Sequence, residues 1–425
     1  MQPNLVRGRI EIFSKMRLVS LCLVLLLVVV VVSKKEDCPS YGCALLPRDV
    51  IFDSEARSAL KEIGGAVSSK TPKEKKKKAA ALRELQSSGN DDRVTMTLIG
   101  YKGGELSDQI NQDRAFVLDP FMKDETAGAT APLLMGVLDG HGRLGEVVSE
   151  YARDEIPKRL AEKLADLPSI DDGSVSSQIE AALKETFVEV DESVPTDGVG
   201  GCTSTVTLRW GNKVYVANAG DSVTMVAVHI AMPSLVDEDD EPQPADILFV
   251  TREDKPHLPD ERERIESMGG TVSIPRSYRE DSSRVMHTDP KTGMQTGLAM
   301  SRSIGDWMMV GVIAEPLVET LDLEEIVNEI VEERSDCSDG TCVSLSKDNV
   351  HIFAVAASDG LMDYIDPPRL VNAFAAAFYE QDKSGPSHPF LTAETLIHEA
   401  AKQWHADMGG QYRDDIVVAA AKLYP

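Results

Sequence analysis

The sequence contains few basic residues relative to acidic ones. Lys and Arg together number 44, against 70 Asp and Glu, so the 425-residue chain has a formal net charge of −26 at pH 7. Nucleic-acid binding is therefore not expected, because the phosphate backbone requires a basic surface. The acidic balance instead suits a soluble protein that attracts divalent cations.

Cysteine is also scarce. The chain has no Asn-x-Ser/Thr acceptor for N-glycosylation, so glycosylation does not indicate a lumenal location. Among its six cysteines, Cys38 and Cys43 are five positions apart, as are Cys337 and Cys342. Each pair is able to close a small disulfide loop in an oxidising lumen. Zinc binding, which this spacing suits poorly, and free thiols are the alternatives. The cysteines leave the cellular compartment open.

One stretch near the N-terminus has no charged residue. Residues 18–32 are apolar except for Ser20, and basic residues precede them. A helix of this length spans roughly 22 Å, which is short of a hydrocarbon core of about 30 Å, but flanking side chains can extend to the interfaces. We expect a basic tail at 1–16 and a single-pass signal anchor at 17–33, with a cleaved signal peptide as the alternative. The side of the membrane on which the catalytic domain lies stays open.

Two regions of different character follow this stretch. Residues 34–92 are charged and helix-prone, and are predicted to be a tether. Residues 93–425 are expected to form one catalytic domain with an exposed acidic insert near 235–246. In this domain, apolar runs predict strands at 94–101, 114–119, 131–140, 202–210, 213–220, 222–230, 247–251, 350–360 and 414–423. Apolar residues at three-and-four spacing predict helices at 146–166, 176–190, 259–270, 367–379 and 391–405.

The order of these elements predicts the fold class. Strands come in hairpin-like runs separated by pairs of helices, without the strict alternation of a doubly wound parallel sheet. Gly211 and Asn212, for example, lie between two apolar runs and indicate a hairpin. We therefore expect an α+β protein in which antiparallel sheets and helices form mixed layers.

Aspartates stand at the ends of several of the apolar strands. Any one of them is an ordinary turn residue, because Asp and Gly commonly terminate strands. If the strands lie side by side with like ends together, the carboxylates converge and repel one another unless a cation neutralises them. The aspartates in such positions are Asp113, Asp139, Asp221, Asp359, Asp414 and Asp415.

These candidate ligands are oxygen atoms, without an accompanying cluster of His or Cys, which favours Mg²⁺ or Mn²⁺ over zinc or copper. Gly140 lets the backbone come close, so its carbonyl is a further candidate ligand. Two such ions about 3.5–4 Å apart would activate a water and stabilise a transferring phosphoryl group. His141 is the candidate proton donor to a leaving alkoxide, with a surface histidine in a glycine-rich turn as the alternative.

A series of short motifs occurs in order between about residues 95 and 423: "NQDRAF", "GVLDGHG", "GCTSTVTL", "VANAGDS", "ERERIESMGGTV", "GLAMSRSIGD", "AEPLVE", "FAVAASDGLMD" and "YRDDIVV". In this order they resemble the metal-dependent type-2C (PPM) serine/threonine protein phosphatase family. The resemblance implies a four-layer α-β-β-α sandwich of two antiparallel sheets flanked by helices. It also implies hydrolysis of phosphoserine or phosphothreonine in proteins by metal-activated water, without a phosphoenzyme.

The resemblance also implies a role for each candidate residue. Asp139 would bridge two Mg²⁺ or Mn²⁺ ions, and Asp221 would bind a possible third ion. Asp113 would hold a metal-bound water in the same cluster, and His141 would be the general acid, so both are expected to be catalytic. The implied metal ligands are Asp139, Gly140, Asp359, Asp414, Asp113 and Asp221.

Some positions depart from the family pattern. Gln112 stands where members often have Glu, so the metal affinity is expected to be lower. The arginine that holds the phosphate in many members has no counterpart, and the substrate-binding residues stay unassigned, with Lys102 and Arg114 as candidates. Asp306, in "SRSIGD", is expected to anchor a turn or loop rather than to bind a metal.

Two other functions remain as alternatives. The missing arginine suggests a membrane-tethered, non-catalytic phosphoprotein binder, which would be a pseudophosphatase. Hydrolysis of small phosphoesters is the other alternative, because loops decide which substrate a fold accepts. The expected partners are phosphorylated protein substrates, and we expect the protein to be a monomer.

Overall fold

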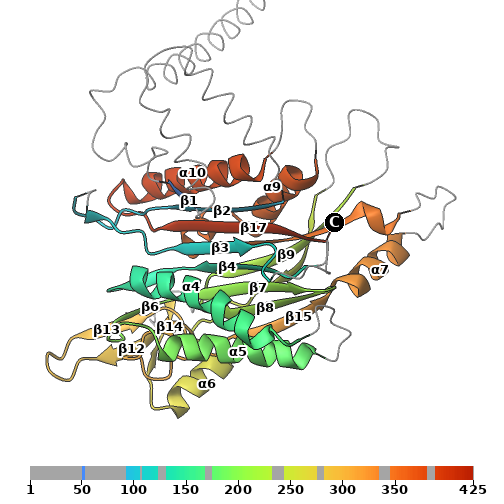
Figure 1. Cartoon of the computed structure of the whole chain (residues 1–425). Coiled ribbons are helices and arrows are strands. Elements are labelled where there is room, and N and C mark those ends of the chain that lie inside the picture. Colours follow the sequence, from blue (N-terminus) through green and yellow to red (C-terminus); the bar gives the residue numbers. More distant parts are fainter. Residues whose placement is uncertain are drawn as a thin grey trace, which may run out of the picture. The chain divides into compact units, whose positions relative to one another are not determined.

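Two antiparallel sheets form the centre of the fold (Figure 1). The computed structural model describes residues 50–52, 92–105, 108–122, 131–167, 175–231, 244–274, 282–334, 345–380 and 388–424. The six-stranded sheet has the order β1 (Val50–Phe52), β2 (Arg93–Leu98), β17 (Ile416–Tyr424), β16 (Val350–Ala357), β9 (Val223–Ile230) and β10 (Asp246–Val250). The five-stranded sheet has the order β15 (Leu317–Asp322), β8 (Lys213–Ala219), β7 (Ser204–Trp210), β4 (Leu133–Leu138) and β3 (Arg114–Leu118).

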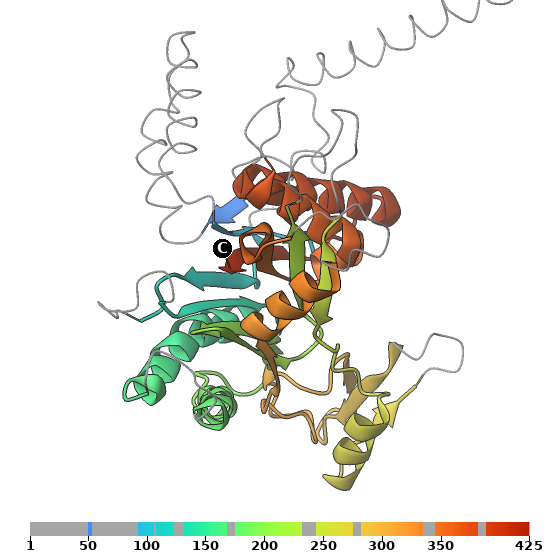
Figure 2. The same cartoon turned by 90° about the vertical axis from the view of Figure 1, so that its right-hand side faces the viewer.

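A pair of helices covers the outer face of each sheet. α4 (Gly145–Leu164) and α5 (Ser176–Glu192) lie on the five-stranded sheet, whereas α9 (Pro367–Tyr379) and α10 (Pro389–Met408) lie on the six-stranded sheet (Figures 1 and 2). This arrangement is a four-layer α-β-β-α sandwich, so the predicted α+β class and architecture are confirmed. A further helix, α7 (Leu323–Arg334), was not predicted and packs against β8, β15 and β16.

The position of β4 in the middle of the sandwich explains why its sequence is an unbroken apolar run. Leu133, Met135 and Val137 belong to a cluster with residues of β9, β16 and β17 in the other sheet. Leu134 and Leu138 belong to a second cluster, with residues of α4 and α5. Because successive side chains of a strand point to opposite faces, a strand that is covered on both sides must be apolar throughout.

α4 is continuous although it contains Pro157. A proline inside a helix costs about 3 kcal/mol, because it removes a hydrogen bond and its ring clashes with the preceding turn. Val148, Ile156 and Leu160 are fully buried on the side of α4 that packs on the sheet. Burying each such side chain stabilises the fold by about 1.5–3 kcal/mol, so their burial outweighs the cost of the proline.

A smaller region lies to one side of the sandwich, at the lower right of Figure 2. It contains α6 (Pro259–Ser267) and a three-stranded sheet of β11 (Val272–Ser273), β12 (Arg284–Thr288) and β13 (Gln295–Leu298). The helix was predicted at 259–270 and is confirmed. The small sheet was not predicted, because its strands are short and β13 is mostly exposed, without an alternating apolar pattern.

The predicted hairpin at Gly211 is also confirmed. β7 and β8 pair in antiparallel register from Ser204 opposite Ala219 to Trp210 opposite Lys213. Gly211 has a φ of 60°, in the left-handed region that glycine adopts without strain. The two late helices predicted at 367–379 and 391–405 are present as α9 and α10.

Several predicted features fall outside the described residues. They are the basic tail at 1–16, the anchor at 17–33, both cysteine pairs and nearly all of the acidic insert near 235–246. Within the expected tether at 34–92, β1 pairs with β2. Across the ranges that the structure describes, no helix is both long enough and apolar enough to cross a membrane.

Candidate metal centre

Strand register brings three of the predicted aspartates to one edge of the five-stranded sheet. Asp113 directly precedes β3 and Asp139 directly follows β4, and these strands pair with Arg114 opposite Leu138. Asp221 follows β8, whose last residues pair with the first residues of β7. β7 is also antiparallel to β4, so the ends of β4 and β8 lie at the same edge. Three segments far apart in the sequence therefore meet there.

The six-stranded sheet contributes two more of the predicted aspartates, Asp359 and Asp414, at the ends of neighbouring strands. Asp359 is the first residue of α8 (Asp359–Met362) and comes two residues after β16 ends. Asp414 precedes β17 by two residues. These strands pair with Ala357 opposite Val418, so the end of β16 lies beside the start of β17. Asp359 and Asp414 are therefore neighbours.

The charges of Asp113, Asp221, Asp359 and Asp414 all act on Asp139, which places the five aspartates in one cluster. Burial, and then the charges of the other four aspartates, raise the pKa of Asp139 well above its ordinary value. Burial and the charges of Asp221 and Asp414 raise the pKa of Asp359 to about 7, against a hydrogen bond with Asp139 that lowers it. A divalent cation in the cluster would reverse this effect and keep the carboxylates ionised.

Asp113 provides a direct test of whether a cation fits. It is 1% exposed, and its Oδ2 accepts a hydrogen bond from Ser358 Oγ at 3.0 Å. Its Oδ1 is buried and has no hydrogen-bond partner among the described residues. A buried carboxylate oxygen without a partner is costly, and burial and the charge of Asp415 raise the pKa of Asp113 well above its ordinary value. The residues present therefore fit Mg²⁺ or Mn²⁺.

In the described part of the chain, no group of three or more carboxylate, imidazole or thiolate side chains is arranged so that these side chains alone could hold a metal ion. Direct ligation by three side chains is not a requirement for Mg²⁺, which usually keeps several waters and takes one or two carboxylates from the protein. Backbone ligands are also used by such ions. Gly140, in β5 (Gly140–Gly142), has no room for a Cβ, which would collide with the carbonyl oxygens of Gln112 and Gly145.

Two ammonium groups lie beside the cluster. Lys102 Nζ is 3.0 Å from Asp414 Oδ1 and 3.3 Å from Asp415 Oδ2. Lys255 Nζ is 2.6 Å from Asp221 Oδ2. Burial lowers the pKa of each lysine, but the charges of these aspartates outweigh it and raise the pKa above its ordinary value. The sequence did not predict a role for Lys255.

Asp415 and Ser358 are two further members of the cluster. Asp415 was predicted as a strand-end aspartate but was given no role, and Ser358 was not predicted. The carboxylate of Asp415 accepts hydrogen bonds from the backbone N–H groups of Gly100 and Gln112. Ser358 Oγ accepts a hydrogen bond from the backbone of β17 and donates one to Asp113. Their positions directly beside Asp414 and Asp359 in the sequence were the available signal. Both residues therefore hold together the segments that carry the predicted ligands.

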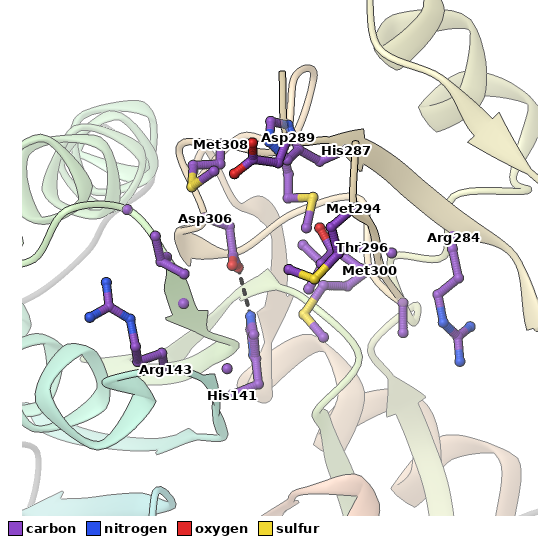
Figure 3. A pocket seen from close by; sticks show the side chains of 18 residues that line it. His141, Arg143, Arg284, His287, Asp289, Met294, Thr296, Met300, Asp306 and Met308 are labelled. Atoms are coloured by element: carbon purple, nitrogen blue, oxygen red, sulfur yellow. Dashed lines mark hydrogen bonds and ion pairs between the residues drawn. The ribbon is translucent and has the colours of Figure 1, made fainter. Parts of the chain in front are cut away.

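His141, in β5, is held by Asp306. His141 Nε2 lies 2.6 Å from Asp306 Oδ2 (Figure 3). Ser303 Oγ donates to the same oxygen at 2.7 Å. Burial lowers the pKa of His141, but the charge and hydrogen bond of Asp306 outweigh it and raise the pKa above its ordinary value. His141 Nδ1 is buried and makes no hydrogen bond of normal geometry among the described residues, although the backbone of Asp139 contributes to raising the pKa of the imidazole. The protonated imidazole is therefore favoured, and Nδ1 is the nitrogen left to donate.

Asp306 was expected to anchor a turn or loop, and it also contacts His141. It follows β14 (Ile304–Gly305) with a φ of 56°, which is unusual for a residue other than glycine. Its backbone N–H donates to the carbonyl of Gly200 in β6 (Gly200–Cys202), the strand that pairs with β5. The contact with His141 depends on this packing of β14, β6 and β5, which no local pattern in the sequence reports.

Comparisons with known proteins agree with this geometry. The family model described as protein phosphatase 2C matches residues 102–407, which is more than half of the chain. Probable protein phosphatase 2C 73 from Oryza sativa subsp. japonica is 26% identical over 363 residues, covering 77% of this chain and 71% of that protein. Probable protein phosphatase 2C 48 from the same plant is 27% identical over 357 residues, covering 79% of this chain and 87% of that protein.

A solved structure supports the fold. The serine-threonine phosphatase 2C from Toxoplasma gondii superposes with a TM-score of 0.56 at 17% identity, covering 79% of this chain and 96% of that one. At this identity the similarity supports the fold alone. Together with the family model and the cluster of aspartates, it leads to one assignment: this chain belongs to the protein phosphatase 2C family of metal-dependent serine/threonine protein phosphatases.

Proposed function

We propose that this chain hydrolyses phosphoserine and phosphothreonine in proteins by means of a water activated by two Mg²⁺ or Mn²⁺ ions, with a third ion beside Asp221. The observation that carries the proposal is the cluster of five aspartates, in which Oδ1 of Asp113 is buried and has no partner among the described residues. When bound, the ions supply positive charge that activates the water and stabilises the phosphoryl oxygens.

Each of the aspartates has its own proposed role in binding the ions. Asp139 interacts with each of the other four, which supports its proposed position between two ions. Asp359 and Asp414 come from the other sheet and would hold one of these ions, and the carbonyl of Gly140 would be a further ligand beside Asp139. Asp113 would orient the attacking water through its unpartnered Oδ1.

His141 is the proposed general acid. A leaving serine or threonine oxygen must gain a proton, and an imidazolium can supply it. The carboxylate of Asp306 binds Nε2 at 2.6 Å, fixes the ring and favours the protonated form. Nδ1 is then the atom that donates the proton to the leaving oxygen. Asp306 acts through His141 and is a positioning residue.

Lys102 is the proposed phosphate-binding residue in place of the family's arginine. Its Nζ lies beside Asp414 and Asp415, at the edge of the cluster. Arg114, the other candidate, is engaged elsewhere, because its guanidinium donates to the carbonyl oxygens of Asn111 and Asp113 and to Glu150. Both side chains are already paired, but Lys102 is paired with carboxylates of the cluster itself, and this position supports Lys102 over Arg114.

The experiment measures phosphate release from a phosphothreonine peptide by the full-length chain with Mn²⁺, Mg²⁺ or EDTA. We expect release with either metal, none with EDTA, and a loss of at least a thousandfold in Asp139→Asn, since the bridging charge is removed. Asp154→Asn is the matched control, because Asp154 is exposed on α4, away from the cluster. It should retain full activity.

The same experiment separates the alternatives. A pseudophosphatase would bind the phosphopeptide without turnover, although no feature of the described site favours this function. An enzyme for small phosphoesters would hydrolyse p-nitrophenyl phosphate but no phosphopeptide. Absence of phosphate release from the peptide with both metals would refute the proposal.

Residues 17–33, outside the described ranges, are proposed to anchor the protein in a membrane as a single-pass segment. The support is the uncharged stretch at 18–32 and the basic residues before it. Extraction of the full-length chain from membranes at alkaline pH tests the anchor, and protease protection of a C-terminal tag in intact vesicles tests the side. Release of the chain into the supernatant would refute the anchor.

A further inference from the structure

A cavity of about 510 Å³ adjoins the active site at His141. One side of it is formed by the core of the protein, including His141, Gly200 and Asp306. The other side is formed by the hairpin of β12 and β13 and the residues that follow it, including Met294 and residues 296–300 (Figure 3). None of the five aspartates of the metal centre lines this cavity. It is therefore a neighbouring space, distinct from the site that would hold the ions.

Methionines line much of the cavity. Met294, Met300 and Met308 line the same cavity as His141 and Asp306 (Figure 3), and so does Met309. Met294, between β12 and β13, is 62% exposed. Methionine is flexible and polarisable, so a wall of this kind adapts to apolar side chains of different shapes. The volume lies within the roughly 300–1,000 Å³ that is usual for ligand pockets.

If the proposed function holds, the position of the leaving oxygen places the substrate peptide over this cavity. The phosphoryl group must lie at the aspartates, and the leaving oxygen must lie at His141, which protonates it. That oxygen belongs to the serine or threonine of the substrate, so the peptide chain continues from His141, away from the ions. The cavity begins at His141 and is the surface that the neighbouring residues of the peptide meet.

The charges at the margin favour an acidic segment of peptide. Arg284 lies at the edge of the cavity and donates to the carbonyl of Ser283, and no carboxylate pairs with it in the part of the chain that the structure describes (Figure 3). Asp289, also in the wall, keeps its negative charge, but its carboxylate accepts hydrogen bonds from the backbone N–H groups of Lys291 and Thr292 and is directed into its own turn. In a protein of net charge −26, Arg284 is thus a local site for an acidic side chain.

We propose that this cavity binds an apolar side chain next to the phosphorylated residue of the substrate, and that an acidic residue beside it pairs with Arg284. The phosphatase would then prefer phosphoserine and phosphothreonine peptides with an apolar and an acidic neighbour. The inference rests on the proposed function and adds the class of peptide that the site accepts.

The test compares phosphothreonine peptides that differ at one flanking position, placed on each side of the phosphothreonine in turn. The position carries Leu, Ala or Lys, with or without an adjacent Glu, and kcat/KM is expressed relative to that for p-nitrophenyl phosphate, which has no peptide chain. We expect the Leu peptide to exceed the Lys peptide by roughly tenfold or more on one side, as for other apolar pockets. The adjacent Glu should add a further gain that is lost in Arg284→Gln.

The double variant Met294→Ser/Met308→Ser should lose the preference for Leu. Met268→Ser is the matched control, because Met268 is 52% exposed at the end of α6 and does not line the cavity. Equal kcat/KM for all flanking residues, with p-nitrophenyl phosphate still hydrolysed, would overturn this inference alone. Retention of the preference in the double variant would overturn it too, whereas absence of hydrolysis of every substrate would refute the proposed function and this inference with it.

Discussion

At the scale of single residues, the contact between His141 and Asp306 is the one that most directly controls a protonation state. The two side chains lie 2.6 Å apart, and Asp306 also accepts a hydrogen bond from Ser303. Burial alone would lower the pKa of the imidazole, and the carboxylate reverses that effect. A neutral side chain of the same shape at position 306 would keep the packing and remove the charge.

Asp306→Asn is therefore expected to shift the pH dependence of kcat. Asn tolerates the positive φ at this position, so the fold should be retained. Without the negative charge the pKa of His141 falls, the imidazole loses its proton at lower pH, and the alkaline decline in kcat moves to lower pH. We also expect kcat to fall by roughly a hundredfold, as for the loss of general acid catalysis. An unchanged alkaline limb in the kcat–pH profile would exclude the proposed role of Asp306.

Lys102 gives a second prediction at this scale. If Lys102 binds the phosphate of the substrate, Lys102→Gln should raise KM for a phosphopeptide roughly tenfold or more, because a hydrogen bond to a charged group contributes about 1.5–3 kcal/mol. The measurement is steady-state kinetics with saturating Mn²⁺. Lys402→Gln is the control, since Lys402 is exposed on α10 and should leave KM unchanged. Equal KM values for Lys102→Gln and the native chain would assign the phosphate to another residue.

At the scale of elements, α6 is fixed to the core through the carboxylate of Glu261. Glu261 is 1% exposed and accepts hydrogen bonds from Arg302, Arg264 and Arg252. Arg302 lies in the same short segment as Asp306, so this ion cluster links α6 to the segment that holds His141. Burial raises the pKa of Glu261, but the hydrogen bonds outweigh it, first those of Arg302, and lower the pKa to about 2.

Glu261→Gln should destabilise the fold by about 2–3 kcal/mol at pH 7. Breaking a fully buried pair costs more, but Arg252 and Arg264 reach solvent and part of the effect is screened. Because the native pKa is lowered from 4.5 to about 2, this stabilisation is complete above pH 4.5 and is lost as the pH falls through about 2. Urea unfolding should thus give a smaller difference between variant and native chain at pH 3.5 than at pH 7.

The exposed Glu263, on the same helix, provides the control for this measurement. Glu263→Gln should leave the free energy of unfolding unchanged within about 0.5 kcal/mol, as is usual for surface substitutions. A difference for Glu261→Gln that does not depend on pH would show that the carboxylate charge is not the source of the stabilisation.

Also at the scale of elements, the sequence predicted the helices and strands whose apolar residues recur at a regular spacing, and it missed those without such a pattern. β4 and α4 were predicted because burial on one or two faces leaves a regular apolar pattern. The sheet of β11, β12 and β13 was missed because it is short and largely exposed. Its hairpin forms one wall of the cavity at His141, so the part of the site that meets the substrate's neighbours could not be predicted.

At the scale of the whole molecule, the sequence predicted which aspartates meet, because each lies at the end of an apolar strand. It did not predict the contacts that depend on how the segments pack in three dimensions. The pairing of His141 with Asp306 joins residues 165 positions apart, and that of Lys102 with Asp415 depends on the loop before β3 lying against the start of β17. No local sequence pattern predicts contacts between segments so far apart in the chain. The end of an apolar strand, in contrast, can be recognised from the sequence.

The central claim is that the converging aspartates form a divalent-cation site, and thermal unfolding of the native chain and of Asp139→Asn, each with Mn²⁺ and with EDTA, tests it most directly. In the native chain, Mn²⁺ at about one hundred times its Kd should raise Tm by roughly 5–10 °C over EDTA, because the ion binds only the folded state. In Asp139→Asn, Tm in EDTA should equal or exceed that of the native chain, since one repelling charge is gone, and Mn²⁺ should raise it little. No rise in the native chain, or an equal rise in the variant, would contradict the account.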